Sequence, residues 1–282
     1  MTAPILVTGA TGSVGSSVVD QLMAAGAPVR ASARRPAALD LPDDVERVEL
    51  DLVRPGTFGP ALAGVRSVFL YVQPAGLDAF LAAAARAGVE HLVVLSSQTV
   101  NEHISGREAI AAMHKAVEQK VVDSGLPCTF VRPGHFATNA LLWGWAAQLR
   151  AGDVLRFPYP DLENAAIHEK DIAAVAVTAL VEPGDQGQAY FVTGPESISQ
   201  RRQLADIAAA TGRSLQFVEL SPEETRPMLL RQMPEWVTDA MLLSWQASNG
   251  VPAEVSDGVE KVTGRPARPF AEWAADHAKD FG

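Results

Sequence analysis

The chain has 282 residues, of which 48% are hydrophobic and 20% charged, and this is enough apolar material for one large α/β domain, alone or with a smaller lobe. Its formal net charge of −10 and its lack of a basic run argue against nucleic-acid binding, because nucleic-acid phosphates repel an acidic surface. The single cysteine, Cys128, excludes an internal disulfide and a cysteine-cluster metal site, and a first apolar run too short for a signal sequence or membrane span favours a cytoplasmic location.

The chain opens with a short apolar run that stops at a glycine-rich turn. Residues 5–7 have the length of a buried strand, the glycines stand at Gly9, Gly12 and Gly15, and a helical pattern follows. In dinucleotide-binding units the first glycine makes the tight turn, the second lets the backbone approach a pyrophosphate, and the third lets helix pack on strand. The alternative is a plain tight turn. The strand-turn-helix context favours the dinucleotide site.

The second strand is expected at residues 28–33, and the side chains at its end bear on which dinucleotide is bound. NAD sites usually place a carboxylate there to hold the ribose 2′-hydroxyl. This chain has Ser32, Arg34 and Arg35 instead, and no acid before Asp40. Two guanidinium groups favour a 2′-phosphate, so we expect NADP(H) to be preferred over NAD(H). A solvated charge pair at a strand end is the alternative.

Three further strands are expected at residues 45–52, 67–72 and 91–97. Because parallel strands bind ligands at their carboxyl ends, the residues there become candidate cofactor contacts. These candidates are Asp51, Leu52, Val72, Gln73, Pro74, Ser96 and Ser97. Asp51 has two interpretations: it accepts a hydrogen bond from the adenine amine, or it caps the short helix that follows.

The alternation of strands and helices continues to a sixth strand and loop at residues 128–136, and predicts a doubly wound parallel sheet, the Rossmann architecture. We expect a nucleotide-binding domain at residues 1–150, sheet-completing segments near 165–195, and a smaller, mostly helical substrate lobe at 151–282. The run from His168 to Asp171 lacks metal-ligand spacing, and Asp171 is interpreted as a helix N-cap. No metal site is expected.

Several ordered motifs carry a family resemblance. They are Gly9-Ala-Thr-Gly12-Ser-Val-Gly15, Leu95-Ser96-Ser97, His114-Lys-Ala-Val-Glu118, Ser124-Gly125-Leu126-Pro127 and Val131-Arg132-Pro133-Gly134-His135-Phe136-Ala-Thr-Asn139. In this order they resemble the NmrA-like atypical short-chain dehydrogenases/reductases. The tail from Val259 to Phe270 is similar to the branch that includes the ergot-alkaloid iminium reductases. The family also contains quinone and triphenylmethane-dye reductases, and redox-sensing regulators that do not turn the cofactor over.

The resemblance implies an NAD(P)H-binding Rossmann domain with a small C-terminal lobe. Carried over position by position, it assigns the pyrophosphate to Thr11, Gly12, Ser13 and Val14, and the 2′-phosphate to Arg34. The remaining candidates follow the sixth strand or precede the helix that carries His114. Pro133 and Gly134 are expected to contact the cofactor, and Gln98, His135, Phe136, Asn139 and Trp143 to contact the substrate, with Trp143 and Trp145 as an aromatic wall. Core packing is the alternative for the tryptophans.

The chain departs from the wider superfamily at its catalytic motif. Orthodox members use Tyr-x-x-x-Lys, but Ile110 and His114 stand at those positions, and no tyrosine lies between Tyr71 and Tyr159. Lys115 points about 100° away on a helix. Hydride transfer to an activated, small-molecule acceptor, iminium-like or quinone-like, needs no strong protein acid.

In this interpretation His114 contacts the cofactor, orients its ribose or nicotinamide, and donates a proton; a surface or core histidine is the alternative. A non-catalytic NADP(H) sensor and a redox-neutral biosynthetic enzyme remain as other functions. The sequence leaves open whether the protein is a monomer or a homodimer.

Overall fold

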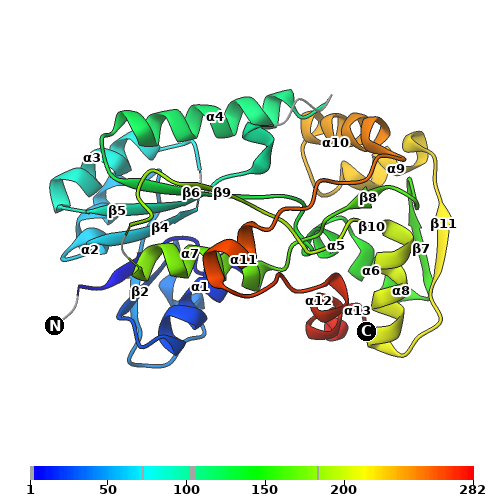
Figure 1. The fold of residues 1–282 in the computed structure, drawn as a ribbon, viewed down its shortest axis with the longest axis horizontal. Helices are drawn as coiled ribbons and strands as arrows, with labels where there is room; N and C mark the ends of the chain where they lie inside the picture. Colours follow the sequence, from blue (N-terminus) through cyan, green and yellow to red (C-terminus); the bar gives the residue numbers. More distant parts are fainter. Residues whose placement is uncertain (1–2, 72, 102–105, 183) are drawn as a thin grey trace.

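The computed structural model describes residues 3–71, 73–101, 106–182 and 184–282 (Figure 1). Within these ranges seven parallel strands form one sheet in the order β3-β2-β1-β4-β5-β6-β9. The strands are β1 (Ile5–Val7), β2 (Val29–Ala33), β3 (Glu46–Glu49), β4 (Ser67–Tyr71), β5 (His91–Leu95), β6 (Cys128–Pro133) and β9 (Ala189–Val192). The order reverses between β1 and β4, where doubly wound sheets bind their ligands. The predicted fold class is confirmed.

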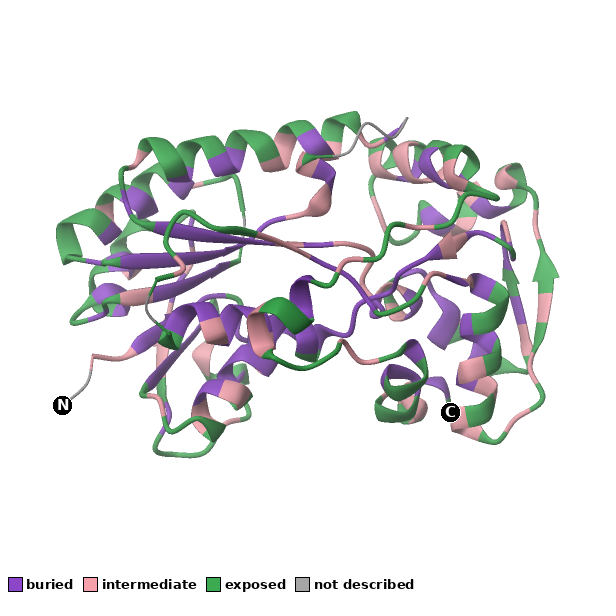
Figure 2. Ribbon diagram, in the orientation of Figure 1, coloured by how far each residue is buried: buried purple, intermediate pink, exposed green. Residues whose placement is uncertain are grey.

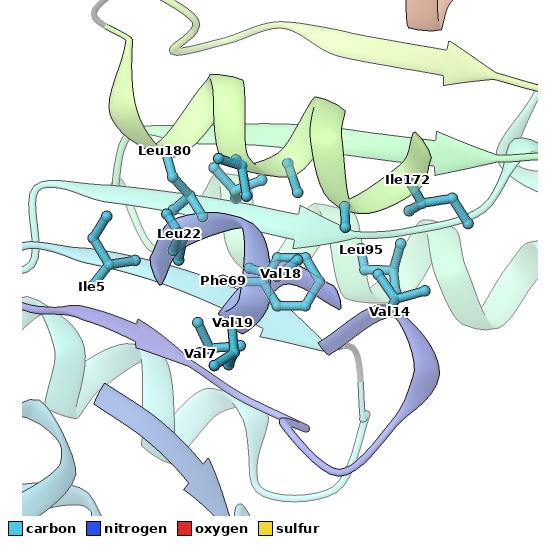
Figure 3. Close-up of a cluster of buried hydrophobic side chains, with 14 of the residues drawn as sticks. Ile5, Val7, Val14, Val18, Val19, Leu22, Phe69, Leu95, Ile172 and Leu180 are labelled. Carbon is cyan, nitrogen blue, oxygen red and sulfur yellow. The ribbon is translucent and has the colours of Figure 1, made fainter. Parts of the chain in front are cut away.

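One face of the sheet is covered by α1 (Ser13–Ala24), α7 (Glu169–Val181) and α11 (Gly258–Thr263). Figure 3 shows the apolar side of α1, with Val18 and Leu22, between β1 and α7. Both side chains are fully buried, because the apolar residues of α1 recur at helical spacing on the side that meets the sheet. This packing holds the glycine turn at the N-terminus of α1 in place.

The opposite face is covered by α2 (Phe58–Leu62), α3 (Leu77–Ala87) and α4 (Glu108–Asp123). The five inner strands of the sheet are mostly buried, as their purple colour in Figure 2 shows, whereas the edge strands β3 and β9 are mostly half-buried. Short 3-10 turns follow the carboxyl ends of three strands. They are η1 (Pro36–Ala38), η2 (Pro55–Thr57) and η3 (Gln98–Val100). These connections form the edge of the sheet where the candidate site residues gather.

A mostly helical region, which overlaps the lobe predicted at residues 151–282 and also includes residues before it, has its own core, centred on Trp145, Phe157 and Trp273. Its helices are α5 (Asn139–Leu142), α6 (Trp145–Ala151), α8 (Gln200–Thr211), α9 (Pro222–Leu229), α10 (Glu235–Ser248), α12 (Phe270–Asp276) and α13 (Ala278–Phe281). Two small strand pairs complete it: β7 (Val154–Phe157) with β11 (Gln216–Glu219), and β8 (Glu163–Asn164) with β10 (Ile198–Ser199). Between β8 and β10 the chain returns to the large sheet, where it forms α7 and β9. Later in the sequence, α11 packs on α7.

The N-terminus of α7 corrects one prediction. The N-cap is His168, whose Nδ1 accepts a hydrogen bond from the backbone N–H of Lys170, and Asp171 lies inside the first turn. The Asp171 carboxylate instead accepts from the backbone N–H of Arg268 (2.7 Å) and pairs with the Arg268 guanidinium. The N-cap prediction for Asp171 was wrong because a distant segment of the tail supplies the carboxylate with stronger donors.

Candidate functional site

The glycine turn after β1 has the geometry that its sequence predicts. Gly9 adopts φ +65°, a conformation that favours glycine, and its carbonyl accepts from the N–H of Gly12 (2.9 Å). A Cβ on Gly15 would lie 2.1 Å from the Gly9 carbonyl oxygen, so only glycine fits where the helix meets the turn. No side chain caps α1, whose first N–H groups are therefore left for an anionic ligand.

A groove of ≈ 520 Å³ runs from this turn along the carboxyl ends of the strands. It brings together most of the predicted cofactor contacts. These are Gly9, Thr11, Gly12, Ser13, Val14, Gly15, Ser32, Arg34, Asp51, Leu52 and Gln73. Phe136, predicted for the substrate, lines the same groove, and predicted Val72 lies outside the described residues.

The two arginines after β2 differ in position. Arg34 is exposed and lines the groove, whereas Arg35, also exposed, precedes η1 and is not part of its wall. Ser32 is buried, and its hydroxyl donates a hydrogen bond to the carbonyl of Val7 (2.9 Å). Ser32 therefore lines the groove, but its hydroxyl proton is already used within the protein. Only Arg34 of this group directs a charge to the groove.

Asp51 lines the groove from the segment that follows β3. Its Oδ1 accepts from the backbone N–H of Val53 (3.2 Å), and its own N–H donates to the hydroxyl of Thr57 (3.1 Å). The carboxylate therefore closes a local turn rather than capping η2, whose N-cap is Arg54. Of the two interpretations, the helix cap is wrong.

Sequence reasoning missed several residues of the groove. They are Thr8, Ala33, Leu50, Tyr71, Leu95, Thr138 and Leu142. Thr8, Ala33, Leu50 and Leu95 adjoin predicted contacts at strand ends, so their positions were available from the pattern. Tyr71 lies beside the glycine turn, since a Cβ on Gly9 would stand 3.2 Å from its Cβ. Leu142, with 63% of its surface exposed, gave no sequence signal, because only the fold brings this end of α5 to the groove.

The hydroxyls of the two serines after β5 form hydrogen bonds within the protein. The Ser96 hydroxyl is buried and donates to Oε1 of Glu118 on α4 (2.6 Å). Arg132 of β6 donates to both oxygens of the same carboxylate, at 2.9 and 2.6 Å. Ser97 is the N-cap of η3 and accepts from the N–H of Thr99 (3.3 Å). Among the residues that the structure describes, neither serine lines the groove, although both were predicted as cofactor contacts.

His114 lies on α4, one turn before Glu118, with Ile110 one turn earlier. Its Nδ1 is buried and has no hydrogen-bond partner within the described part of the chain. Burial lowers the pKa of His114, an effect that the nearby Glu118 carboxylate partly offsets, so the imidazole is neutral at pH 7. In the described ranges His114 lines neither the groove nor the second cavity.

The second cavity, of ≈ 230 Å³, lies between the loop after β6, β8 and α10. Gln98 and His135, two of the predicted substrate contacts, line it. The pKa of His135 is lowered to about 3, by burial first and then by the positive charge of Arg107, so its ring is neutral. His135 lines this cavity and the next residue, Phe136, lines the groove, so the loop after β6 contributes to both spaces.

The remaining predicted contacts line neither space in the described chain; they are Pro74, Pro133, Gly134 and Asn139. Trp143 corrects the prediction of an aromatic wall: it is buried, meets the His135 ring edge-on at 5.0 Å and stacks on Phe157. Trp145 is buried in the same core. The tryptophan that lines the second cavity is Trp245, from α10, which contacts Trp143.

Metal sites and membrane-spanning helices are both absent from the described residues. No group of three or more His, Cys, Asp and Glu side chains among them has the arrangement of a metal site. No helix in the same ranges has the length and hydropathy to span a membrane.

Comparison with known proteins gives consistent matches. A family model described as NAD(P)H-binding matches residues 9–183. The (4-alkanoyl-5-oxo-2,5-dihydrofuran-3-yl)methyl phosphate reductase of Streptomyces griseus is 43% identical, over 98% of this chain and 99% of its own. The NAD(P)H azoreductase of Xenophilus azovorans is 39% identical, over 99% of each chain.

Among solved structures, the Citrobacter sp. triphenylmethane reductase complexed with NADP(H) superimposes with a TM-score of 0.78. The match covers 98% of this chain and 99% of that one, at 23% identity, and at that level it bears on the fold alone.

Proposed function

The chain belongs to the NmrA-like atypical short-chain dehydrogenases/reductases and is an NAD(P)H-dependent reductase, and from this premise we propose that it uses NADPH to reduce a small, electronically activated acceptor. The observation that carries the proposal is the residue pair at the usual Tyr-x-x-x-Lys positions, Ile110 and His114. Neither side chain is a strong acid at neutral pH.

The groove fits a dinucleotide. The uncapped N-terminus of α1 supplies N–H donors for the pyrophosphate, and the close approach of Gly15 to Gly9 leaves no room there for a side chain. The exposed Arg34 guanidinium supports NADPH, because a 2′-phosphate offers it charge-assisted hydrogen bonds that a hydroxyl does not. When bound, NADPH supplies the hydride. The protein orients the nicotinamide and excludes water.

The acid-base groups near the site favour an activated acceptor. Tyr71 is the one phenol on the described wall of the groove, and it stands by the glycine turn rather than on α4. His114 and His135 both have lowered pKa values and are neutral at pH 7. A neutral imidazole donates a hydrogen bond but is a weak proton donor. An acceptor that stabilises its own added charge, such as an iminium or a quinone, suits this arrangement.

The names of the two relatives support the same class. One is a reductase of an alkanoyl-oxo-dihydrofuran, and the other is an azoreductase. In both acceptors electron-withdrawing groups or heteroatoms polarise the unsaturated bond. We extend this class of acceptor, not either substrate, to the present chain.

The test is NADPH oxidation by the purified protein, followed at the nicotinamide absorbance, with panels of quinones, cyclic imines and enones. We expect turnover with at least one activated panel and none with simple ketones or alcohols. Tight NADPH binding with no turnover on any activated acceptor would overturn the proposal and support an NADP(H) sensor. Efficient reduction of simple ketones would also overturn it, because that reaction needs a strong proton donor and the described residues at the Tyr-x-x-x-Lys positions, Ile110 and His114, supply none.

A further inference from the structure

The second cavity has a fixed aromatic wall. Trp245, 3% exposed, lines the cavity from α10, and its ring meets Trp143 edge-on at 4.8 Å and Phe157 at 5.3 Å. These ring contacts leave the indole few alternative rotamers. The wall is therefore rigid at the level of the side chain.

The helix that carries Trp245 is also held in place. The Nε of Arg107 donates to the hydroxyl of Ser244, the preceding residue (2.7 Å). A Cβ on Gly106, which has φ +89°, would lie 2.6 Å from the carbonyl oxygen of Ala240, so the backbones of α10 and of residue 106 are in close contact. A side chain at residue 106 would therefore push α10 away from this segment. The wall moves only if α10 does.

The size and position of the cavity limit what it admits. Its ≈ 230 Å³ exceed the roughly 150 Å³ of an apolar cavity that binds benzene, so one substituted six-membered ring fits. It begins at Gln98, which follows β5, and at His135, which follows β6, while Leu95 and Phe136 from the same strand ends line the cofactor groove. Both spaces therefore lie at the same edge of the sheet, the edge where an acceptor must lie to receive a hydride from bound cofactor.

We propose that Trp245 is the residue that sets acceptor size, so that the cavity takes single-ring acceptors and rejects fused three-ring ones. This inference rests on the proposed function, because it assigns the acceptor of that reaction to this cavity. It replaces Trp143, the tryptophan that the sequence favoured, with one that lies 102 residues later in the chain.

The experiment compares quinones with one, two and three rings: 1,4-benzoquinone, 1,4-naphthoquinone and 9,10-phenanthrenequinone. The quantity measured is the ratio of kcat/KM for three rings to that for one ring, relative to the wild-type ratio, so that intrinsic reactivity cancels. Trp245→Leu should raise this ratio about 10-fold or more, the range in which apolar pockets discriminate size. Trp236→Leu removes an exposed tryptophan from the same helix, 53% exposed, and should leave the ratio within about twofold.

A second variant guards against misfolding of Trp245→Leu. Ser248→Phe adds a ring from the same wall and should weaken the one-ring quinone about 10-fold while the NADPH dissociation constant stays unchanged. Quinone binding to the protein–NADP⁺ complex, measured by calorimetry, gives the same ratios without turnover. Loss of turnover with the expected binding ratios would count against the proposed function alone. Unchanged ratios in Trp245→Leu and unchanged one-ring binding in Ser248→Phe would overturn the role of Trp245.

Discussion

Arg34 and Arg35 are neighbours in the sequence with the same chemistry, yet only one of them lies on the groove. Successive residues leaving a strand point to different sides, so the fold directs one guanidinium to the cofactor edge and the other to solvent. The pair therefore provides a variant and its matched control within two residues.

We predict that Arg34→Ala removes the preference for NADPH over NADH. Loss of a charge-assisted contact worth roughly 1.5–3 kcal/mol should raise the NADPH dissociation constant about 10- to 100-fold and leave that of NADH nearly unchanged. Arg35→Ala should change neither constant more than about twofold. Titration of both variants with both cofactors is the measurement. Equal affinities of the native protein for the two cofactors would refute the assignment.

His114 lines neither space in the described chain, so the prediction follows from its position in the catalytic motif alone. We predict that its replacement by alanine lowers kcat about 10²-fold, with a smaller effect on the NADPH dissociation constant. Because burial lowers the pKa of this imidazole, the neutral form persists above pH 6.5, so kcat of the native enzyme should be flat from there towards alkaline pH. Lys115→Ala, on the exposed side of α4, is the control. A kcat that falls steeply as the pH rises through 6.5 would show instead that the imidazolium is the acid.

At the scale of elements, one buried carboxylate joins α4 to the sheet. Glu118 accepts from Ser96 at the end of β5 and from Arg132 in β6, so a helix and two strands share one charge. The Glu118 side chain is 9% exposed and the Arg132 side chain 18%. A buried ion pair of this kind contributes little over an apolar pair, but removing one partner leaves an uncompensated charge in the interior. The register of α4, and with it the position of His114, depends on this contact.

We therefore predict unequal costs for two variants of this cluster. Glu118→Ala should lower the free energy of unfolding by about 3–5 kcal/mol, because Arg132 stays buried without its partner. Ser96→Ala removes one donor and keeps the ion pair, and should cost about 1 kcal/mol. Urea denaturation of both variants measures the difference. Equal costs would mean that Arg132 finds another partner or reaches solvent.

At the scale of the whole molecule, a cluster of hydrogen bonds and ion pairs connects the C-terminal segment to α7, which packs on the sheet. The Glu169 carboxylate on α7 bonds to Nε2 of His277 (2.7 Å) and to the indole N–H of Trp273 (3.0 Å), and His277 also bonds to Asp280 (2.7 Å). Burial by itself lowers the pKa of His277, but the bonds to Glu169 and Asp280 outweigh it and raise that pKa. For Glu169, burial raises the pKa, and the bonds to His168 and His277 reverse the direction.

This cluster predicts a pH dependence of stability. Because its folded pKa lies above the ordinary 6.5, His277 should stabilise the fold fully below pH 6.5, and the contribution is lost as the pH rises through the raised value. At pH 6, His277→Gln should cost on the order of 1.5–3 kcal/mol, and less at pH 9. Thermal unfolding of both proteins across this range is the measurement, and a difference that does not change with pH would contradict it.

The matched control is His91→Gln. Burial lowers the pKa of His91, so its effect on stability should have the opposite dependence, with the native histidine most favourable above pH 6.5. Glu169, with a lowered pKa, adds a contribution that is lost as the pH falls below its ordinary 4.5.

The sequence by itself determined the parallel sheet and its glycine turn, because both follow from local chemistry. Apolar runs of strand length, glycines at 9, 12 and 15 and helical spacing after them each act within a few residues, and parallel strands must bring their carboxyl ends to one edge. Eleven of the predicted cofactor contacts line the groove for this reason. Whether they bind NADPH stays a prediction, as does the division of the chain at residue 150.

Only the tertiary structure decided which side chains of equal chemistry face a cavity. Trp143 and Trp245 are both large aromatic residues, and nothing local distinguishes the one in the core from the one on the cavity wall. Ser96 gives its hydroxyl to Glu118, 22 residues away, and Asp171 gives its carboxylate to Arg268, 97 residues away. Such partners are set by how layers pack against each other, and local sequence patterns carry no information about that packing.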